Sequence, residues 1–419
     1  MVFHHLFFKS TLLVLLTNTI FADESLLIKS LNSLKSEKIK TPLSYGVRPY
    51  YLRNQLEDSS LKEKLLACQN ITPRRSDFSI AHRGAPLQFP EHTKESYMAA
   101  IHMGAGIHEC DVTFTKDKKL VCRHSQCDLH QTTDILLTPL AEKCSEPFRP
   151  YDATANSPAH AKCCTSDITL EEFYTLQGTM DASNPKAANI QEFVNAPSDF
   201  RTDLYANDGG TLMSHQDSIV LFEHYALKMT PEIKSPSVRM PFNDFSQHDY
   251  IDAVVKEYDE AGVDMKDVFI QSFNLSDLLY LVKKYPLLAK NVIYLQEEFD
   301  KDYTKDIKRL SDIKNAGITT IAPPIWALVS LDKEGRLQSS LYAKALKEKD
   351  FKIITWSLER SKITPQTQGG WYYQSISKII SKNSDIYKVL FILDKEVGVS
   401  GVFSDWPATT TFYHNCMHP

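Results

Sequence analysis

The sequence has no long hydrophobic run past its start, no excess of positive charge and no Cys-x-x-Cys pair. After the first 22 residues, no stretch approaches the ~20 apolar residues that a membrane-spanning helix needs. The formal net charge is -5, so we do not expect nucleic acid as a partner. Without a Cys-x-x-Cys pair, disulfides are a better interpretation of the cysteines than a zinc site. No solenoid-type repeat is present.

The first 22 residues predict an export signal. Lys9 precedes an apolar run, Thr11–Leu16, and cleavage after Ala22 would leave Asp23 as the new N-terminus. The run is too short for a spanning helix, although an uncleaved anchor or a buried helix is the alternative. We therefore expect an exported protein, periplasmic or secreted. Residues 23–77 are expected to form an N-terminal arm.

Eight cysteines fit an oxidising compartment. Cys110 stands between two acidic residues, Glu109 and Asp111. If these acids share one face of a strand, Cys110 faces the other way and is expected to be a buried thiol, unless it is paired after all. Connectivity stays open, because spacing alone does not determine it. Five cysteines cluster in one region: Cys122, Cys127, Cys144, Cys163 and Cys164.

From residue 78 onward, short apolar runs alternate with amphipathic helical patterns. This alternation predicts a parallel sheet, and at this length an eight-stranded TIM (β/α)8 barrel over residues 78–413. Residues 125 to about 168 have little periodicity and residues 179–210 are again irregular, which predicts an inserted, cysteine-containing subdomain over about residues 125–210. One strand candidate is extra, because there are nine: 78–81, 107–114, 120–123, 226–233, 268–271, 291–295, 317–321, 352–356 and 402–405.

Acidic residues occur at predicted strand positions that could share one site. Glu109 and Asp111 stand two residues apart on a strand, so both point to the same face. Together with Glu232 they supply three hard oxygen ligands, which suit one divalent cation, Ca²⁺ or Mg²⁺. Separate structural salt bridges are the alternative for each acid.

Basic residues stand near these acids in the predicted barrel. His82 and His124 are candidates for general acid and base catalysis. Arg83 can grip a phosphoryl oxygen through its planar guanidinium, and Lys234 can supply a point charge. The combination predicts a metal-dependent phosphodiesterase.

An ordered set of motifs resembles the glycerophosphodiester phosphodiesterase family over about residues 78–412. No single motif is decisive, but the order is specific. The family is known as a TIM barrel with an insertion after the second catalytic histidine. The motifs are His82-Arg83-Gly84, Pro90-Glu91-His92-Thr93, Glu109-x-Asp111-Val112, Thr115-Lys116-Asp117, His124, Glu232-Ile233-Lys234, Gln271-Ser272-Phe273, Thr355-Trp356 and Phe403-Ser404-Asp405-Trp406-Pro407.

The resemblance implies hydrolysis of a small glycerophosphodiester to glycerol 3-phosphate and an alcohol such as choline or ethanolamine. The route is either a cyclic phosphate or direct attack by water. The implied roles are metal binding for Glu109, Asp111 and Glu232, acid/base catalysis for His82 and His124, phosphate binding for Arg83 and Lys234, support of Arg83 or a histidine for Glu91, and an apolar wall facing the glycerol for Phe273 and Trp356.

The sequence departs from the family at His124-Ser125, where the family often has His-Asp. A carboxylate that could orient the imidazole is thus missing. One alternative is a phospholipase D-like enzyme acting on lysophospholipid or sphingolipid headgroups, with Trp371, Tyr372 and Tyr373 as an exposed rim. We favour packing of these aromatics inside the insertion that carries them, and so do not favour membrane contact. A non-catalytic secreted binding protein is a further alternative, and a glycosidase a weaker one.

Overall fold

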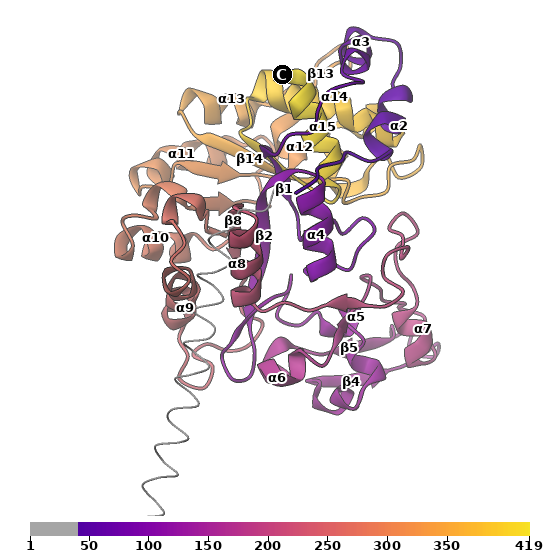
Figure 1. Cartoon of the computed structure of the whole chain (residues 1–419), viewed down its shortest axis with the longest axis vertical. Helices are drawn as coiled ribbons and strands as arrows, with labels where there is room; N and C mark the ends of the chain where they lie inside the picture. Colours follow the sequence, from indigo (N-terminus) through magenta and orange to yellow (C-terminus); the bar gives the residue numbers. More distant parts are fainter. Residues whose placement is uncertain (1–40) are drawn as a thin grey trace, which may run out of the picture.

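The computed structural model describes residues 41–419 (Figure 1). The export signal expected at residues 1–22 and the first part of the N-terminal arm lie outside the described residues. Within the described part, no helix has both the length and the apolar character needed to cross a membrane.

Eight parallel strands close into a barrel, which confirms the predicted fold. Each strand pairs with the next around the ring, and the last, β15, pairs with β1. In order around the barrel the strands are β1 (Ser76–Ala81), β2 (Ala105–Phe114), β8 (Lys228–Ile233), β9 (Gln271–Ser272), β10 (Ile293–Leu295), β11 (Thr320–Ala322), β14 (Lys352–Leu358) and β15 (Gly401–Ser404).

The ninth predicted strand is β3 (Leu120–Cys122), which lies outside the ring. It pairs antiparallel with the end of β2, with Cys122 opposite Val112. A tight turn connects the two, because the Thr115 amide bonds the Lys119 carbonyl at 2.9 Å. One of the nine candidates was expected to be extra or misassigned, and β3 is that strand, because a hairpin strand has the same apolar pattern as a barrel strand.

Helices cover the outside of the barrel, and several of them begin at side-chain caps. Thr93, Ser246 and Ser340 each accept a hydrogen bond from a backbone amide three residues on. The helices are α4 (Lys94–His102), α8 (His215–His224), α9 (Gln247–Glu260), α10 (Leu275–Lys284), α11 (Thr304–Asn315), α12 (Ile325–Leu328), α13 (Leu341–Glu348), α14 (Ile386–Ile392) and α15 (Pro407–Met417).

Helix α8 begins at the cap Ser214, which forms a capping box with Asp217. Thr211 belongs to the short strand β7 (Gly210–Thr211), which pairs with β6 (Gln177–Gly178).

Between β3 and α8 the chain leaves the barrel and builds a small substructure, seen below the barrel in Figure 1. It has its own apolar cluster, which includes Leu129, Phe173 and Phe193. So small a core benefits from cross-links, and two disulfides supply them, Cys127–Cys164 and Cys144–Cys163. The boundaries of the insertion stay a prediction. Its other elements are α5 (Leu129–Thr132), β4 (Glu146–Arg149), β5 (His160–Lys162), α6 (Leu170–Phe173) and α7 (Ile190–Val194).

The described part of the N-terminal arm packs on the C-terminal end of the chain (Figure 1). Helices α2 (Arg48–Asn54) and α3 (Ser60–Ala67) contact α15. The disulfide Cys68–Cys416 fastens the two chain ends covalently.

Apolar side chains from successive strands fill the barrel interior below its mouth. They leave the carboxyl ends of the strands free for polar groups, which is where functional residues of such barrels lie. These interior residues are Ile80, Ile107, Ile293, Leu295, Ala322, Ile354 and Phe403. A hairpin of β12 (Val329–Leu331) and β13 (Leu337–Ser339) and the 3₁₀ segment Gly370–Ile379 stand on the loops after β11 and β14.

Candidate active site

A cavity of about 600 Å³ opens at the carboxyl ends of the barrel strands. All the site residues predicted from the sequence line it except two, Glu91 and Asp111, which lie in direct contact with the lining residue Arg83. The predicted residues that it brings together are up to 274 positions apart in the sequence, from His82 to Trp356. The predicted residues on its wall are His82, Arg83, Glu109, His124, Glu232, Lys234, Phe273 and Trp356.

Three carboxylates meet at one side of this cavity. Strand β2 carries Glu109 and Asp111, and the register places Asp111 beside Glu232 of β8. One oxygen of each lies within 4.8 Å of the others. The Oδ1 atom of Asp111 is buried and has no hydrogen-bond partner among the described residues. Three crowded oxygens, one of them unpaired, fit a divalent cation.

The ionisation of these acids reflects their crowding. Burial, with the charges of Asp111 and Glu232, raises the pKa of Glu109 well above its ordinary value. Burial and the charge of Asp111 also raise the pKa of Glu232, to about 8, against the opposing effect of Lys234. Burial would raise the pKa of Asp111 too, but Lys234, His92 and Arg83 hold it well below normal. A bound cation would relieve this repulsion.

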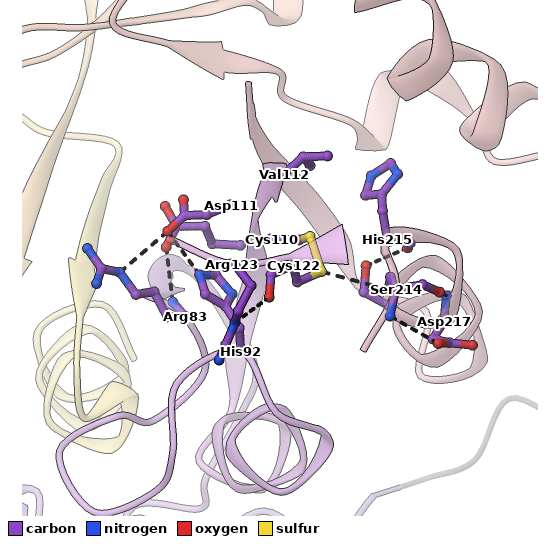
Figure 2. Close-up of a disulfide and its surroundings, with 12 residues drawn as sticks. Arg83, His92, Cys110, Asp111, Val112, Cys122, Arg123, Ser214, His215 and Asp217 are labelled. Carbon is purple, nitrogen blue, oxygen red and sulfur yellow. Dashed lines mark hydrogen bonds and ion pairs between the residues drawn. A yellow bond between two sulfur atoms is a disulfide. The ribbon is translucent and has the colours of Figure 1, made fainter. Parts of the chain in front are cut away.

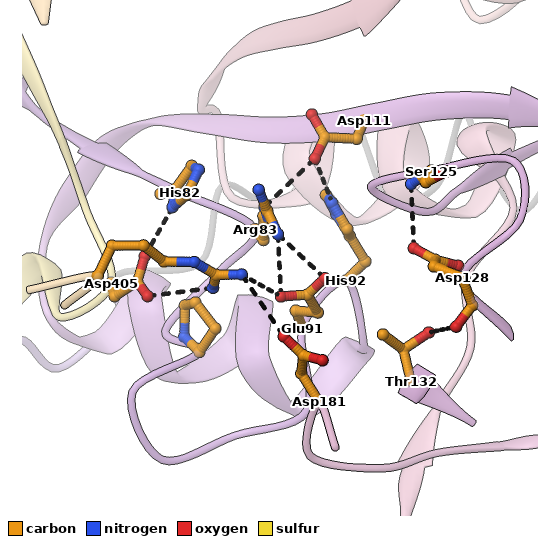
Figure 3. Close-up of polar contacts among 12 residues, drawn as sticks. His82, Arg83, Glu91, His92, Asp111, Ser125, Asp128, Thr132, Asp181 and Asp405 are labelled. Atoms are coloured by element: carbon orange, nitrogen blue, oxygen red, sulfur yellow. Dashed lines mark hydrogen bonds and ion pairs between the residues drawn. The ribbon is translucent and has the colours of Figure 1, made fainter. Parts of the chain in front are cut away.

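His82 follows strand β1 and is held by a carboxylate from the last strand. Its Nδ1 atom donates to Oδ1 of Asp405 at 2.6 Å (Figure 3). Burial, followed by the positive charge of Arg83, lowers the pKa of His82 to about 4. The pKa of Asp405 is itself low, because Arg360 and His82 outweigh the effect of its burial. At neutral pH the pair is a neutral imidazole on an aspartate, with Nε2 free of the proton.

Arg83 turns sharply into the site. Its φ is +58°, and the next residue, Gly84, has φ +96° with no room for a Cβ, which would lie 2.3 Å from Oγ of Ser96. The amide of Arg83 donates to Oε2 of Glu109 at 3.0 Å, and its guanidinium donates to both oxygens of Glu91 at 3.1 Å. Glu91 therefore supports Arg83, one of the two roles expected for it.

The second predicted cation and the second histidine lie across the cavity. Nζ of Lys234 lies 2.6 Å from Oε1 of Glu232 and 5.9 Å from the ring centre of Phe273. His124 is partly exposed, and its ring forms no hydrogen bond with any residue in the described part of the chain. Burial, Arg83 and Lys234 together hold the pKa of His124 well below normal. Among the described residues, no carboxylate bonds to the His124 ring in place of the one missing after it.

Four further residues of the site carried no assigned role in the sequence. His92 binds Oδ2 of Asp111 through Nε2 at 2.9 Å (Figure 3). Asp405 orients His82, and Arg360 lies 3.2 Å from Asp405. Gln271 donates to Glu109 at 2.8 Å while its own Oε1 has no partner in the described structure. His92, Gln271 and Asp405 lie within the family motifs, but Arg360 had no sequence signal.

The three aromatic residues of the expected rim lie in different environments. Tyr373 is fully buried, so its packing inside the protein is confirmed. Trp371 and Tyr372 line the cavity, and Trp371 is 43% exposed. The segment after β14 therefore walls the site, and of these three residues only Trp371 is extensively exposed to solvent.

Of the two possibilities left open for Cys110, a buried thiol and a paired cysteine, the structure shows the second. Cys110 is buried behind the carboxylates, as expected, but it forms a disulfide with Cys122 (Figure 2). The antiparallel pairing of β3 with β2 brings the two cysteines together, which the sequence did not reveal. All eight cysteines are paired, as is typical of a protein that matures in an oxidising compartment.

A TIM barrel with clustered carboxylates, histidines and cations at its mouth defines a phosphodiester hydrolase of the barrel class. The chain belongs to the glycerophosphoryl diester phosphodiesterase family, whose model matches residues 82–409. It is thus an enzyme of the glycerophosphodiester phosphodiesterase type.

Similar proteins come from several kingdoms. An "Extracellular protein" of Arthroderma benhamiae is 38% identical over 244 residues, which are 57% of this chain and 100% of that one. The glycerophosphodiester phosphodiesterase GDPDL5 of Arabidopsis thaliana is 23% identical over 360 residues, 80% of this chain and 42% of that protein. A phosphodiesterase structure from Oleispira antarctica, in complex with the product sn-glycerol-3-phosphate, has 16% identity and a TM-score of 0.46, covering 79% of this chain and 94% of that one.

Proposed function

We propose that the protein hydrolyses glycerophosphodiesters to glycerol 3-phosphate and an alcohol, with the help of one divalent cation. One observation carries this proposal: Glu109, Glu232, His82 and Arg83 line a single cavity, with Asp111 grouped with the two glutamates and Asp405 bonded to His82 directly behind it. Family membership supports the substrate class.

Glu109, Asp111 and Glu232 would hold the cation. The all-oxygen ligand set favours Ca²⁺ or Mg²⁺ over softer metals. When bound, such an ion polarises a phosphoryl oxygen and stabilises charge that develops on it. The unpaired Oδ1 of Asp111 and the raised pKa values of Glu109 and Glu232 support a cation at this position.

His82 acts as the base. Asp405 fixes the proton on Nδ1, which leaves Nε2 to accept a proton from the attacking hydroxyl, whether of the glycerol or of water. His124 acts as the acid that protonates the leaving oxygen. In the free protein Arg83 and Lys234 lower its pKa, and a bound phosphodiester anion offsets both charges.

Arg83 and Lys234 bind the phosphate. Glu91 holds the guanidinium of Arg83 in place, so its remaining N–H groups are oriented before substrate arrives. Glu232 does the same for Lys234. Both cations are therefore pre-organised rather than recruited by the substrate.

The test is turnover of glycerophosphocholine, glycerophosphoethanolamine and lysophosphatidylcholine, measured before and after EDTA and after restoring Ca²⁺ or Mg²⁺. We expect hydrolysis of the deacylated diesters, loss with EDTA and recovery with the cation. Activity that survives chelation contradicts the cation assignment. Turnover of the lyso lipid alone supports the phospholipase D-like alternative, and no turnover of any diester supports the binding protein.

We propose that the chain is exported and that residues 1–22 are its signal. The four disulfides and the relative named as extracellular support this proposal. Expression in a secreting host, with N-terminal sequencing of protein from the medium, should find Asp23 first. Retention in the cell with Met1 intact would contradict it.

A further inference from the structure

The loop that follows His124 contains a buried carboxylate that the proposed hydrolysis does not use. Asp128 is 6% exposed and forms no ion pair with any residue in the described part of the chain. Burial raises its pKa to about 6, although the positive charge of Arg123 opposes this shift. Such a buried carboxylate costs free energy of folding unless its contacts offset that cost.

The side chain of Asp128 points backward along the chain rather than toward the helix that it precedes. Asp128 is the N-cap of α5, where an aspartate normally accepts a hydrogen bond from an amide two or three residues on, but it makes no such bond. Its Oδ2 instead accepts from the amide of Ser125 at 3.0 Å (Figure 3), and its Oδ1 has no hydrogen-bond partner among the described residues. The one side-chain hydrogen bond that the described structure gives Asp128 therefore holds the residue directly after His124.

The backbone before His124 is also held from its side. Arg123 is fully buried, and its guanidinium donates to the carbonyl oxygens of Glu91 and Thr132. Oγ1 of Thr132 in turn donates to the carbonyl oxygen of Asp128 at 3.1 Å (Figure 3), so the two flanks of His124 share a support. Since the His124 ring has no hydrogen bond in the described structure, its place on the cavity wall depends on this backbone.

We propose that Asp128 is a positioning residue for His124, which fixes the backbone after the histidine and so aims the imidazole at the leaving oxygen. This role depends on the proposed function, in which His124 is the acid. Ser125 stands where the family often has an aspartate, and Asp128 supplies a carboxylate three residues further along. A carboxylate bonded to the ring would raise the pKa of His124, whereas a bond to the backbone orients the ring without that direct effect.

The test uses two substrates that differ in their need for an acid. Glycerophosphocholine releases an alkoxide that must be protonated, whereas the p-nitrophenyl ester of glycerol 3-phosphate releases a phenolate that leaves without a proton. Asp128→Ala should lower kcat for glycerophosphocholine by about 10–10²-fold and change kcat for the p-nitrophenyl ester by less than about twofold. A merely structural defect would lower kcat for both esters alike.

Two further variants separate the position of His124 from general stability. Asp128→Asn keeps an oxygen that can accept from the Ser125 amide, so it should restore most of the kcat for glycerophosphocholine. Asp134→Ala is the matched control, since Asp134 also binds a backbone amide of the insertion, that of Gln177 at 2.9 Å, and lies outside the cavity lining. Asp134→Ala should leave the ratio of the two kcat values unchanged.

A double variant tests whether Asp128 acts through His124. In the His124→Ala protein, the further change Asp128→Ala should alter kcat for glycerophosphocholine by less than about twofold, because the group that Asp128 positions is already gone. A full additional loss in that background overturns the positioning role and leaves the hydrolysis standing. An equal loss on both esters in Asp128→Ala alone has the same consequence.

A measurement that does not depend on activity covers the case in which the hydrolysis itself fails. If the wild-type protein cleaves neither ester, the proposed function is wrong. Hydrogen exchange, followed by mass spectrometry of peptides that contain the Ser125 amide, then decides whether Asp128 holds this loop. We expect exchange to be severalfold faster in Asp128→Ala than in the wild type and in Asp128→Asn. Equal exchange in all three proteins overturns the role of Asp128.

Discussion

The two histidines of the site are supported in opposite ways. His82 is held by neighbours within the barrel, since Asp405 binds its Nδ1 and Arg360 pairs with Asp405. His124 stands at the root of the insertion without a hydrogen bond from its ring in the described structure. Its position depends instead on the backbone of β3, which the disulfide Cys110–Cys122 ties to β2. One histidine is fixed by hydrogen bonds to its ring, the other by the strand that carries it.

Removal of either imidazole should have the largest effect on activity. We expect His82→Ala and His124→Ala each to lower kcat/KM by about 10²–10⁴-fold, the range typical of a lost general acid or base. The fold should survive His82→Ala, because Asp405 keeps its ion pair with Arg360. Steady-state kinetics with thermal melts checks both points. Retention of a tenth or more of the activity by either variant would remove that histidine from the mechanism.

Removing the support of His82 should be nearly as damaging. Asp405→Asn places an amide against Nδ1 of His82 and so favours the tautomer with its proton on Nε2. The base must carry no proton on Nε2, so we expect a loss of about 10²–10⁴-fold in kcat. Asp405 raises the pKa of His82, so replacing Asp405 should lower this pKa. The acidic limb of the pH–rate profile should therefore not move to higher pH. The two measurements are kcat and the pH–rate profile. An acidic limb that moves upward would show that Asp405 serves another purpose.

The barrel could be predicted because strand and helix periods differ and alternate along the chain. The carboxylate site could also be predicted, since a spacing of two on a strand puts Glu109 and Asp111 on one face and Glu232 ends a neighbouring strand. Arg360 could not, because it lies on a loop and meets Glu91 only in the folded state, 269 residues away. No local pattern encodes such a contact.

The pairing between strands was the second feature that the sequence did not predict. The pattern at residues 120–123 gave a strand but neither its partner nor its direction. Without that pairing, the state of Cys110 stayed open, and the link between β2 and the strand leading to His124 was invisible. His92 lay in a recognised motif, yet only its 2.9 Å contact with Asp111 shows what it does.

Cation binding should depend on pH through the carboxylates. Because the pKa of Glu232 is raised to about 8, this group holds a proton at neutral pH when the cation is absent. Binding then releases that proton. As the pH rises toward 8, affinity for the cation should therefore increase by up to about tenfold per pH unit, and above pH 8 it should level off. Calorimetry in buffers of different ionisation enthalpy measures the release. The Glu232→Gln variant should bind more weakly and lose this part of the pH dependence, and an unchanged slope would contradict the assignment.

The smallest expected effect on activity comes from removing a disulfide, and it best distinguishes the two ways in which His82 and His124 are held. Replacing both Cys110 and Cys122 by Ala should lower the unfolding free energy by roughly 3 kcal/mol and kcat severalfold, because β3 then holds His124 less firmly. Replacing Cys68 and Cys416 by Ala is the matched control. That disulfide spans 348 residues, so its loss should cost more stability, roughly 5 kcal/mol, while kcat stays unchanged. Denaturant melts and steady-state kinetics are measured on both double variants. If kcat falls in both variants in proportion to the stability that each loses, the Cys110–Cys122 disulfide does not position His124.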